Sequence, residues 1–548
     1  MKKSVGTLSL ALLLVGSLLA GCTSKNNGNS AASPSTSTGT AASTAPSGSA
    51  NSSSPKPAAD NMAEKVKLHI MVNGWINNPA NGEDPIKKYL NDKFNVDIQF
   101  DNINANDLEN KLLVQFSSNQ PPDIIFASDK NKIVKLHNQG VLLDDLKPYL
   151  DKVPSIKANF NDLSIPYGTV GGKLIGLPVA PRTNNWGMMI RQDWLDSLGM
   201  KQPTNEKELL DVLRAFTFKD PDKNGKDDTW GISAAGAGKG VGEISFLAAM
   251  FGPTGPATSG GDSVGYYMDG GKLTNTIMDG NHQKFLDLLR TIVSEKLIDP
   301  DWYTQGWEQR KAKLFGDKYG IAWYPPADLY GEADVFANSG KDPTTQWLPM
   351  TLPKAGSAGG LRPPGSVSSG MYAITAEAAK NPVKLQRILK LLNDVTYPNE
   401  AYFALRWGVG VPGIGNKLVD MGGGLTYFDT VPDTVRTKNT GLIDWGSWVA
   451  VGDKVFYGAG PLTDATKKRI GLDNGVAASP AYPNFQDLVT FDSALKTATD
   501  QLKAEFEIKY VLDKGADYAS FKADWLKKGG EKMLTQASEQ LKAMGIAK

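Results

Sequence analysis

The stretch Gly171–Gly199, GGKLIGLPVAPRTNNWGMMIRQDWLDSLG, decides how the fold is interpreted. After its Gly-Gly turn, Lys173 to Leu177 predicts a short strand. Pro178 and Pro181 exclude a helix from the run that follows, because proline lacks the amide hydrogen and restricts the residue before it. Gly187 to Arg191 then predicts a second strand. The stretch therefore contains two strands joined by an extended connection.

A short helix is predicted to close the stretch, with Asp193 as its cap and Gly199 as its stop. Two interpretations of the two strands stay open. In one, the connection crosses between two lobes and Trp186 faces the cleft. In the other, both strands belong to one sheet and Trp186 is a core residue.

Composition indicates an ordinary globular protein with room for two or three cores. The chain has 548 residues, of which 41% are hydrophobic and 21% are charged. The net charge is +1 and no long block of like charges occurs, so nothing indicates nucleic acid as a partner. The 12 Trp and 17 Tyr residues are compatible with an aromatic-lined carbohydrate site, although large cores also contain them. We expect a monomer.

The N-terminus predicts a lipoprotein leader over residues 1–22. Lys2 and Lys3 precede an apolar run, Leu8 to Leu19, which is short for a membrane span. The run ends in Leu-Ala-Gly-Cys, which resembles the bacterial lipobox, so Cys22 is expected to be acylated and to become the first mature residue. Cys22 is the only cysteine, which excludes a disulfide within one chain. The protein is thus expected on the extracellular face of the cell membrane, held by lipid.

Residues 23–62 are rich in Ser, Thr, Ala and Pro and predict a disordered tether, because they carry too little apolar surface to fold. The folded part is expected over residues 63–548. It starts with an alternation of strands and helices: strands at 66–72, 96–100 and 124–127, and helices at 84–94, 108–116 and 133–139. This order is typical of an α/β fold with mainly parallel sheets and helices on both faces.

Several segments, taken in order, resemble the extracellular solute-binding proteins of bacterial ABC importers. The resemblance lies closest to the sugar- and oligosaccharide-binding group that includes maltose-binding protein. The segments that carry it are PPDIIFAS (121–128), GVLLDDLKPYLD (140–151), GGKLIGLPV (171–179), RQDWLDSLG (191–199), GDKYGIAWYPP (316–326) and GMYAI (370–374).

The resemblance implies a two-lobe fold of the type II periplasmic-binding-protein kind, with the ligand cleft between the lobes. Lobe 1 is expected to comprise residues 63–182 and 373–440, and lobe 2 residues 187–370 and 441–548. The implied function is to capture a sugar or oligosaccharide and to deliver it to membrane permease subunits, without catalysis.

For a binding protein of this kind, aromatic rings are expected to stack on sugar rings while polar side chains bind hydroxyl groups. Trp194 and Trp525 lie on amphipathic helices and are assigned to the core. The predicted ligand-binding residues are Trp75, Arg182, Asn185, Trp186, Trp323, Tyr324, Ser369, Arg406, Trp407 and Trp445.

The loop DPDKNGKDDT at 220–229 predicts a structural calcium site. Oxygen-bearing side chains stand at its positions 1, 3, 5 and 9, with glycine at position 6, as hard cations require. Gly231 occupies position 12, so the loop lacks the bidentate glutamate of an EF-hand. The loop resembles one found in the lipoprotein branch of the family, but Thr229 replaces its final glutamate. The predicted ligands are Asp220, Asp222, Asn224, Lys226, Asp228 and Thr229.

Two other functions stay open: a cell-surface glycosidase or esterase on the same anchor, and a peptide-binding importer subunit. Gly261–Gly265 matches G-x-S-x-G around Ser263, but the strand before it and the helix after it that a nucleophile elbow needs are not predicted. The three histidines, His69, His137 and His282, have no metal-ligand spacing. A carboxylate pair of a glycosidase cannot be recognised from sequence, because it is defined by a separation in space.

Overall fold

The computed structural model divides the chain into two units, of which the second is Pro57–Lys548. All the residues that it describes belong to the second unit. They are residues 62–73, 84–103, 107–179, 185–256, 262–326, 328–330, 342–355, 358–414, 417–422, 425–429, 455–458, 463–512 and 515–547. The predicted leader, Cys22 and the tether up to residue 61 lie outside these ranges.

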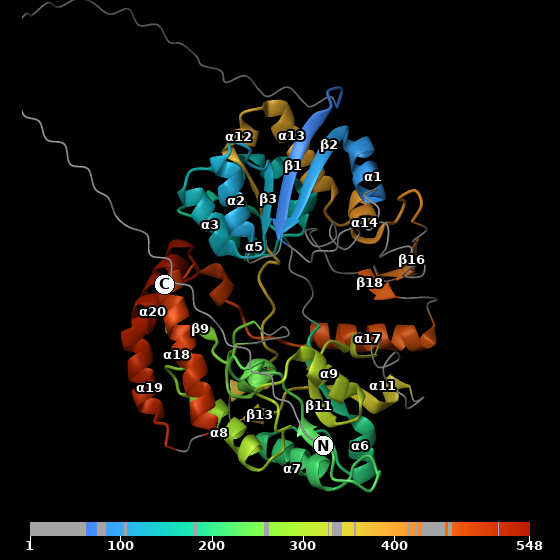
Figure 1. Cartoon of the computed structure of the whole chain (residues 1–548), viewed down its shortest axis with the longest axis vertical. Coiled ribbons are helices and arrows are strands. Elements are labelled where there is room, and N and C mark those ends of the chain that lie inside the picture. Colours follow the sequence, from blue (N-terminus) through green and yellow to red (C-terminus); the bar gives the residue numbers. More distant parts are fainter. Residues whose placement is uncertain are drawn as a thin grey trace, which may run out of the picture. The chain divides into compact units, whose positions relative to one another are not determined.

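The first sheet has the strand order β2-β1-β3-β15-β6, and its strands β1, β2 and β3 are labelled in Figure 1. β1 pairs in parallel with β2 and β3, whereas β15 pairs antiparallel with β3 and β6. β15 comes from a point in the sequence far from β3, so the sheet is completed only after the chain returns to it. The strands are β1 Val66–Asn73, β2 Val96–Ile103, β3 Ile124–Ala127, β6 Leu177–Pro178 and β15 Met371–Ile374.

Helices pack on the first sheet through apolar faces: α1 on β2, α3 on β3 and β15, and α13 on β1. Their starts are set by side chains, because the carboxylate of Asp84 accepts from the first amides of α1 and Asn381 does the same for α13. The helices are α1 Pro85–Phe94, α2 Leu108–Ser117, α3 Lys130–Asn138, α12 Ala376–Ala379, α13 Pro382–Asp394 and α14 Glu400–Trp407.

The second sheet has the strand order β12-β7-β11-β8. β7 is antiparallel to β11 and β12, and β11 is parallel to β8, so this sheet is mixed. All residues of β7 and β11 are buried. Their sequences are apolar except for Arg191 at the end of β7, which forms salt bridges with Asp193 and Asp317. The strands are β7 Gly187–Arg191, β8 Trp230–Ile232, β11 Tyr319–Tyr324 and β12 Trp347–Met350; around them lie α6 Gln192–Leu198, α7 Glu206–Phe218, α9 Trp307–Phe315, α11 Pro343–Gln346 and α17 Asp464–Ala478.

The opening stretch of the sequence is a crossing between these two sheets. β6 belongs to the first sheet and β7 to the second, which excludes the alternative of two strands in one sheet. The chain returns between β12 and β15, and the two connections are hydrogen-bonded to each other: Val179 N–H donates to Gly370 O at 2.9 Å and Ser368 Oγ donates to Val179 O at 2.7 Å.

Asp193 is not the cap of α6, contrary to the sequence-based expectation. The helix begins at Gln192, two residues before the predicted first residue Trp194, and Asp193 lies in its first turn. The carboxylate of Asp193 instead accepts two hydrogen bonds from Arg191, each 2.7 Å long. The helix stops at Gly199 as expected, with a φ of 64°. Trp194 and Trp525 are buried, as their helical spacing predicted.

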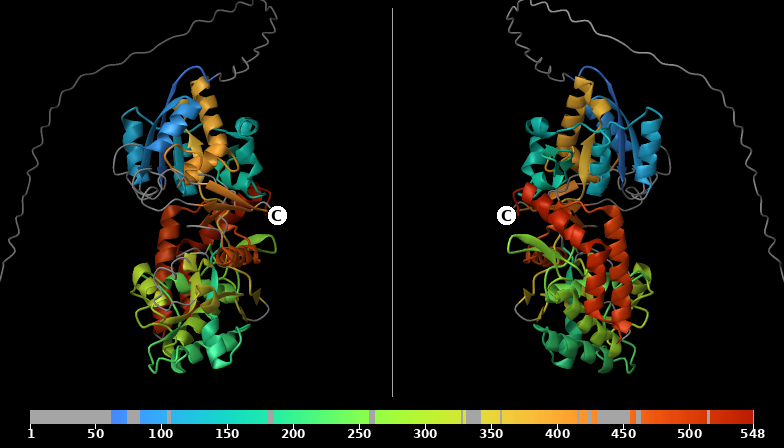
Figure 2. Two further views of the ribbon diagram at one scale, coloured as in Figure 1. Left: turned by 90° about the vertical axis from the view of Figure 1, so that its right-hand side faces the viewer. Right: turned by 90° about the vertical axis from the view of Figure 1, so that its left-hand side faces the viewer.

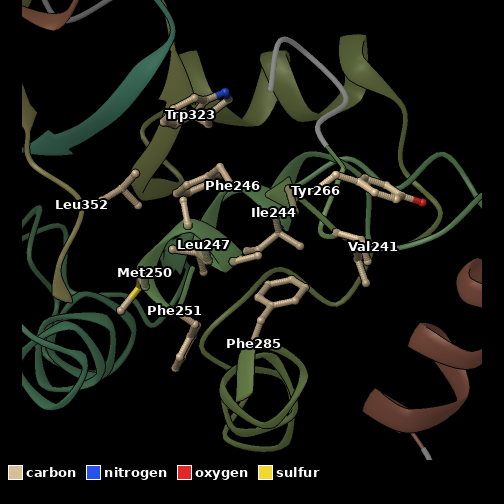
Figure 3. Close-up of a cluster of buried hydrophobic side chains, with 14 of the residues drawn as sticks. Val241, Ile244, Phe246, Leu247, Met250, Phe251, Tyr266, Phe285, Trp323 and Leu352 are labelled. Carbon is tan, nitrogen blue, oxygen red and sulfur yellow. The ribbon is translucent and has the colours of Figure 1, made fainter. Parts of the chain in front are cut away.

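The C-terminal helices lie beside a hairpin and a helix of the middle of the chain (Figures 1 and 2). α18 packs on α8, and α20 packs on β10. Between α8 and the second sheet, apolar residues of the 3₁₀ helix η2, among them Phe246, form a buried cluster with Trp323 of β11 (Figure 3). The elements are η2 Gly242–Met250, β9 Tyr266–Asp269, β10 Lys272–Asn275, α8 Asn281–Ser294, α18 Ser493–Leu512, α19 Tyr518–Trp525, η4 Leu526–Gly530 and α20 Glu531–Ala543.

The remaining described elements are short or peripheral. Among the described residues, every helix is too short or too polar to cross a bilayer. These elements are η1 Lys147–Lys152, α4 Pro154–Ala158, α5 Ser164–Gly168, β4 Thr169–Val170, β5 Lys173–Leu174, β13 Lys354–Ala355, β14 Ala358–Gly359, β16 Lys417–Gly422, β17 Leu425–Asp429, β18 Val455–Gly458 and η3 Gln486–Leu488.

Candidate ligand-binding cavity

A cavity of about 1110 Å³ lies between α18 and the start of α9. Its wall is formed by the glycine-rich loop 235–242, by Trp307 at the start of α9, by Asp262 and Ser263 before β9, and by one side of α18. This volume is at the upper end of what small-molecule sites usually offer, which suits a ligand of more than one ring. Aromatic, amide and carboxylate groups all reach the wall.

The glycine-rich loop brings backbone rather than side chains to the cavity. A Cβ on Gly236 would lie 2.7 Å from Tyr303 O, and a Cβ on Gly242 would lie 2.3 Å from Ala235 O. Gly242 also has a φ of +63°, which disfavours other residues. The loop therefore requires glycine at both positions, and Lys239, its one long side chain, is exposed to solvent.

Trp307 is half-buried and presents its indole ring to the cavity wall. Behind it, the ring of Tyr324 stacks at 5.3 Å between centroids and an interplanar angle of 20°. Trp186, also half-buried, contacts both rings with centroids 5.9 Å away. Residues from three separate parts of the chain therefore build one aromatic group, which we call the cavity aromatic group: Trp186, Trp307 and Tyr324.

A buried ion pair supports the cavity aromatic group. The guanidinium of Arg310 lies 4.8 Å from the Trp307 ring and 5.1 Å from the Tyr324 ring, within the range of cation–π attraction. Its Nη2 contacts Glu243 Oε1 at 2.5 Å and also donates to Ser233 Oγ. Both members of the pair are fully buried, and burial raises the pKa of Glu243 to about 7 although Arg310 opposes this shift. The pair holds Trp307 from its inner side.

The charged groups of the cavity wall are mostly paired. Lys503 forms a salt bridge with Asp262, and Lys496 forms one with Asp500. Burial alone would lower the pKa of Lys503, but the carboxylates of Asp262 and Glu507 outweigh burial and raise it, so Lys503 stays charged. Burial raises the pKa of Asp487.

Ser263 is not arranged as a nucleophile. Its hydroxyl donates to Glu507 Oε1, and it is nearly inaccessible to solvent. His282 contacts the same Glu507 oxygen through Nε2 at 2.9 Å and the Tyr518 hydroxyl through Nδ1 at 2.9 Å. A serine nucleophile needs a histidine in direct contact as its base. Here the carboxylate stands between serine and histidine, which is the order of a structural network.

The structure places the predicted ligand-binding residues in different environments. Trp186 and Tyr324 join the cavity aromatic group, although Tyr324 is itself buried. The Asn185 amide donates to both carboxylate oxygens of Asp473 at 3.0 Å. Ser369 is half-buried on the return connection, and Arg406 is half-buried on α14. Trp75, Arg182 and Trp445, and the side chain of Trp407, lie outside what the structure describes.

Trp323 lies in the apolar core and is also among the residues that line a separate cavity of about 350 Å³, together with Arg362 and Val476. It is 1% exposed, and its ring stacks on Phe246 with centroids 4.9 Å apart and an angle of 12° (Figure 3). Successive residues of a strand point to opposite faces of the sheet, so Trp323 and its neighbour Tyr324 belong to different clusters. The sequence placed both in the cleft because β11 is apolar on both faces, which leaves no alternation to separate them.

Sequence reasoning missed Trp307, Arg310 and Glu243. One signal was present, because residues 307, 310 and 314 share one face of a helix by their spacing. A charged residue such as Arg310 on an otherwise apolar helix face needs a buried partner. Trp307, one helical turn earlier, is placed to shield the Arg310 side chain from solvent. The partner itself, Glu243, is 67 residues away, and no local pattern could identify it.

The loop 220–229 gathers carboxylates around one amide. Asp220 accepts from the amides of Asn224 and Gly225 at 3.0 and 2.9 Å, and the Asn224 side chain contacts Asp222 at 2.8 Å and Asp228 at 3.2 Å. Burial and the nearby carboxylates raise the pKa of Asp222. Such mutual crowding of acidic groups fits a cation between them.

Two features of this loop do not fit the predicted calcium ligands. The Thr229 hydroxyl donates to Phe216 O at 2.7 Å and is buried, so it is directed away from the carboxylates. Asp228 is bound to Lys318 at 2.6 Å, which already supplies a positive charge. Among the described residues, no set of three or more histidine, cysteine or acidic side chains is arranged to hold a metal.

Comparison with known proteins identifies related sequences and folds. The family model described as bacterial extracellular solute-binding protein matches residues 79–393. The polygalacturonan/rhamnogalacturonan-binding protein YtcQ of Bacillus subtilis is 26% identical over 219 residues, 39% of this chain and 41% of that protein. The fructooligosaccharide ABC transporter substrate-binding protein FusA of Streptococcus pneumoniae is 28% identical over 284 residues, 47% of this chain and 50% of that protein. The chain thus spans about half the length of these relatives, or less.

Solved structures match over more of the chain. A solute-binding protein from Bifidobacterium longum infantis, described as binding HMO and associated with an ABC transporter, has a TM-score of 0.67 at 17% identity and covers 87% of this chain and 98% of its own. An EF-hand mutant of FusA in complex with fructo-nystose has a TM-score of 0.61 at 17% identity and covers 87% and 99%. These likenesses show the fold: a two-lobe α/β fold of the type II periplasmic-binding kind.

Proposed function

The chain belongs to the bacterial extracellular solute-binding protein family, and from this premise we propose that it captures a sugar or oligosaccharide for an ABC importer. The observation that carries the proposal is the half-buried Trp307 in the wall of a cavity of about 1110 Å³. Two relatives, one named for binding polygalacturonan or rhamnogalacturonan and one named for fructooligosaccharides, support the same ligand class.

Binding would use two kinds of contact. The indole face of Trp307 stacks on the apolar face of a sugar ring, because both surfaces are flat and weakly hydrated. Carboxylates and amides on the opposite side of the cavity, including Asp500 and Gln501, accept and donate hydrogen bonds to hydroxyl groups. Arg310 and Glu243 keep the indole in place, so that little ordering of Trp307 is needed when a ligand binds.

Residues predicted from the sequence extend the proposed site. Trp186 would contribute through the cavity aromatic group, which it shares with Trp307. Asn185, Ser369 and Arg406 remain proposed ligand contacts, together with Trp75, Arg182, Trp407 and Trp445. Trp323 and Tyr324 would act from behind, by fixing the wall on which the ligand lies. Ligand contacts from both lobes would favour a closed arrangement and present the bound sugar to the permease.

The test is binding without turnover. Purified protein is titrated calorimetrically with a panel of oligosaccharides, and each mixture is then analysed by chromatography after prolonged incubation. We expect micromolar or tighter binding of at least one saccharide, recovered intact. Cleavage of the saccharide would support the glycosidase alternative. Selective binding of peptides from a peptide library, with no saccharide bound, would support the peptide-importer alternative.

We also propose that Cys22 carries the lipid anchor and that residues 23–62 are the tether. The support is the apolar run ending in Leu-Ala-Gly-Cys in the sequence. Two acyl signals, or one with further attraction, are needed for stable membrane attachment, and a diacylated cysteine provides them. In cell fractionation, Cys22→Ala should move the protein from the membrane fraction to the medium or leave it unprocessed. Unchanged membrane attachment of the variant would contradict the anchor.

Calcium binding at 220–229 is proposed for four of the predicted positions. Asp220, Asp222, Asn224 and Asp228 supply oxygen atoms close to one another, as calcium requires. The printed description of an EF-hand in FusA supports a cation-binding loop in a related protein. Bound calcium would supply positive charge that relieves the repulsion among these carboxylates.

A further inference from the structure

We infer from the charges of the cavity wall that the ligand is an uncharged oligosaccharide and that oligosaccharides of uronic acids are rejected. The inference rests on the proposed function, because it assigns a ligand class to the same cavity. It separates this protein from a relative whose printed name describes the binding of polygalacturonan, which is an acidic polymer.

Negative groups outnumber positive groups in the described wall of the cavity. Its carboxylates are Asp262, Asp487, Asp500 and Glu507, and its ammonium groups are Lys239 and Lys503. With all of them ionised, these lining groups carry an excess of two negative charges, which falls to one when Lys496, the salt-bridge partner of Asp500, is counted. The described part of the wall contains no arginine, the residue that binds carboxylates through two parallel hydrogen bonds.

The cation inside the cavity is already neutralised. Lys503 has a side chain that is 14% exposed and is held in a salt bridge with Asp262. The carboxylate of Glu507 adds to the field that keeps Lys503 charged. A uronate that bound to Lys503 would have to displace Asp262 and leave that carboxylate without its partner, which is unfavourable in a buried place. Lys239 is exposed on the loop, where solvent and salt weaken its attraction for a ligand.

The same groups suit hydroxyl donors. Carboxylates only accept hydrogen bonds, so they bind sugar hydroxyls well and cannot bind a second carboxylate. Asp500 is partly exposed, since 47% of its side chain is accessible. Gln486 Oε1 in the cavity wall is buried and has no donor among the residues described. The wall thus offers acceptors that a neutral sugar can satisfy and that a uronate carboxylate would oppose.

The experiment uses pairs of trisaccharides with the same skeleton. One member of each pair is neutral, and in the other a carboxylate replaces the primary hydroxymethyl group of each sugar. Three pairs cover common linkages: α-1,4-galactotriose with trigalacturonate, β-1,4-mannotriose with trimannuronate, and cellotriose with its glucuronate counterpart. The full-length protein is titrated calorimetrically with each, together with neutral fructans. We expect a neutral saccharide to bind, and every uronate to bind at least about tenfold more weakly than its neutral partner, because like charges brought together at an interface are repelled.

A charge-reversal variant tests the cause. Asp500→Lys should narrow the difference in affinity between the neutral and the acidic trisaccharide of each pair. Added salt should narrow the same difference in the unchanged protein, because salt screens exposed charges. Asp227→Lys, on the distant exposed loop, is the matched control and should leave the difference unchanged. Thermal melting and circular dichroism establish that each variant is folded, and Asp500→Asn replaces Asp500→Lys if the latter is not.

The outcomes separate the two proposals. Binding of a uronate as tightly as its neutral partner, or more tightly, would overturn the inference while supporting the proposed function. Failure of every saccharide, neutral and acidic, would overturn both. Preference for the neutral form with no response to Asp500→Lys, to Asp500→Asn or to salt would also overturn the inference, because the preference would then arise from shape.

Discussion

Two groups of aromatic residues beside the second sheet differ in what surrounds their rings. In the core group, Trp323 stacks on Phe246 and is 1% exposed, as part of a cluster of buried apolar side chains (Figure 3). In the cavity aromatic group, Trp307 stacks on Tyr324 but keeps one part of its surface at the cavity. The charged residue Arg310 connects the groups, since its Nη2 donates to Trp323 O while its guanidinium lies over the Trp307 ring.

The difference predicts that the same residue type contributes to stability in one group and to ligand affinity in the other. Removing a ring from the core group leaves a void that the surroundings cannot fill, and the cost falls on the folded state. Removing a half-buried ring at a cavity exposes little new surface in the free protein, so the cost falls on the complex. The following predictions test this separation, beginning with the largest effect.

The largest effect is expected from Trp323→Ala. Truncating a fully buried tryptophan costs roughly 3–5 kcal/mol of unfolding free energy. Urea unfolding followed by circular dichroism measures this loss, and calorimetry with the best saccharide measures affinity. We expect affinity to change less than about threefold. A tenfold loss of affinity with little loss of stability would place Trp323 in the ligand site, as the sequence alone suggested.

Calcium should affect stability alone, because loop 220–229 contributes no residue to the cavity wall. A ligand of the folded state stabilises it by about 2.7 kcal/mol when its free concentration is 100 times its dissociation constant. A chelator should therefore lower the melting temperature of calcium-loaded protein.

Asp222→Ala should melt at the chelated temperature and should not respond to the chelator. Asp227→Ala is the matched control, since Asp227 is exposed in the same loop and is not a predicted ligand. No response of the unchanged protein to a chelator would mean that the loop binds no calcium. A loss of saccharide affinity on chelation would contradict the separation of stability from affinity.

The extent to which the sequence predicted the structure varies with the distance over which contacts are made. The strand Gly187–Arg191 and the buried Trp194 follow from patterns within a few residues, and the structure agrees with both. The apolar run of β11 indicates a buried strand but not the direction of each ring. Burial on both faces removes the alternation that would have distinguished Trp323 from Tyr324.

The cavity aromatic group could not be predicted, because it depends on contacts far apart in the sequence. Trp307 contacts Trp186, which lies 121 residues earlier in the chain, and Arg310 contacts Glu243, which lies 67 residues earlier. The relevant contacts arise from the antiparallel pairing of β7 with β11, which sets Gly187 opposite Tyr324. Local spacing indicated that Trp307 and Arg310 share a helix face, but not that a cavity lies beside them.

The smallest effect in free energy, and the most informative for function, is expected from Trp307→Ala. A stacked ring contributes about 1–3 kcal/mol through the apolar area it buries, so affinity should fall roughly 10- to 100-fold. Stability should fall by less than in Trp323→Ala, because Trp307 is half-buried. Calorimetric titration and urea unfolding of the same preparations give both quantities.

Trp230→Ala is the matched control for Trp307→Ala. Trp230 is also half-buried and also contacts a tyrosine, Tyr319, at 6.2 Å between centroids, but it lies on β8 and does not line the cavity. The Trp230→Ala variant should lose about as much unfolding free energy as Trp307→Ala and should keep its affinity for the saccharide. Equal losses of affinity in the two variants would show that binding responds to general loosening of the second sheet. Loss in Trp307→Ala alone would mean that the indole ring contacts the ligand, and Trp307→Phe should then recover part of the affinity because a smaller ring can still stack.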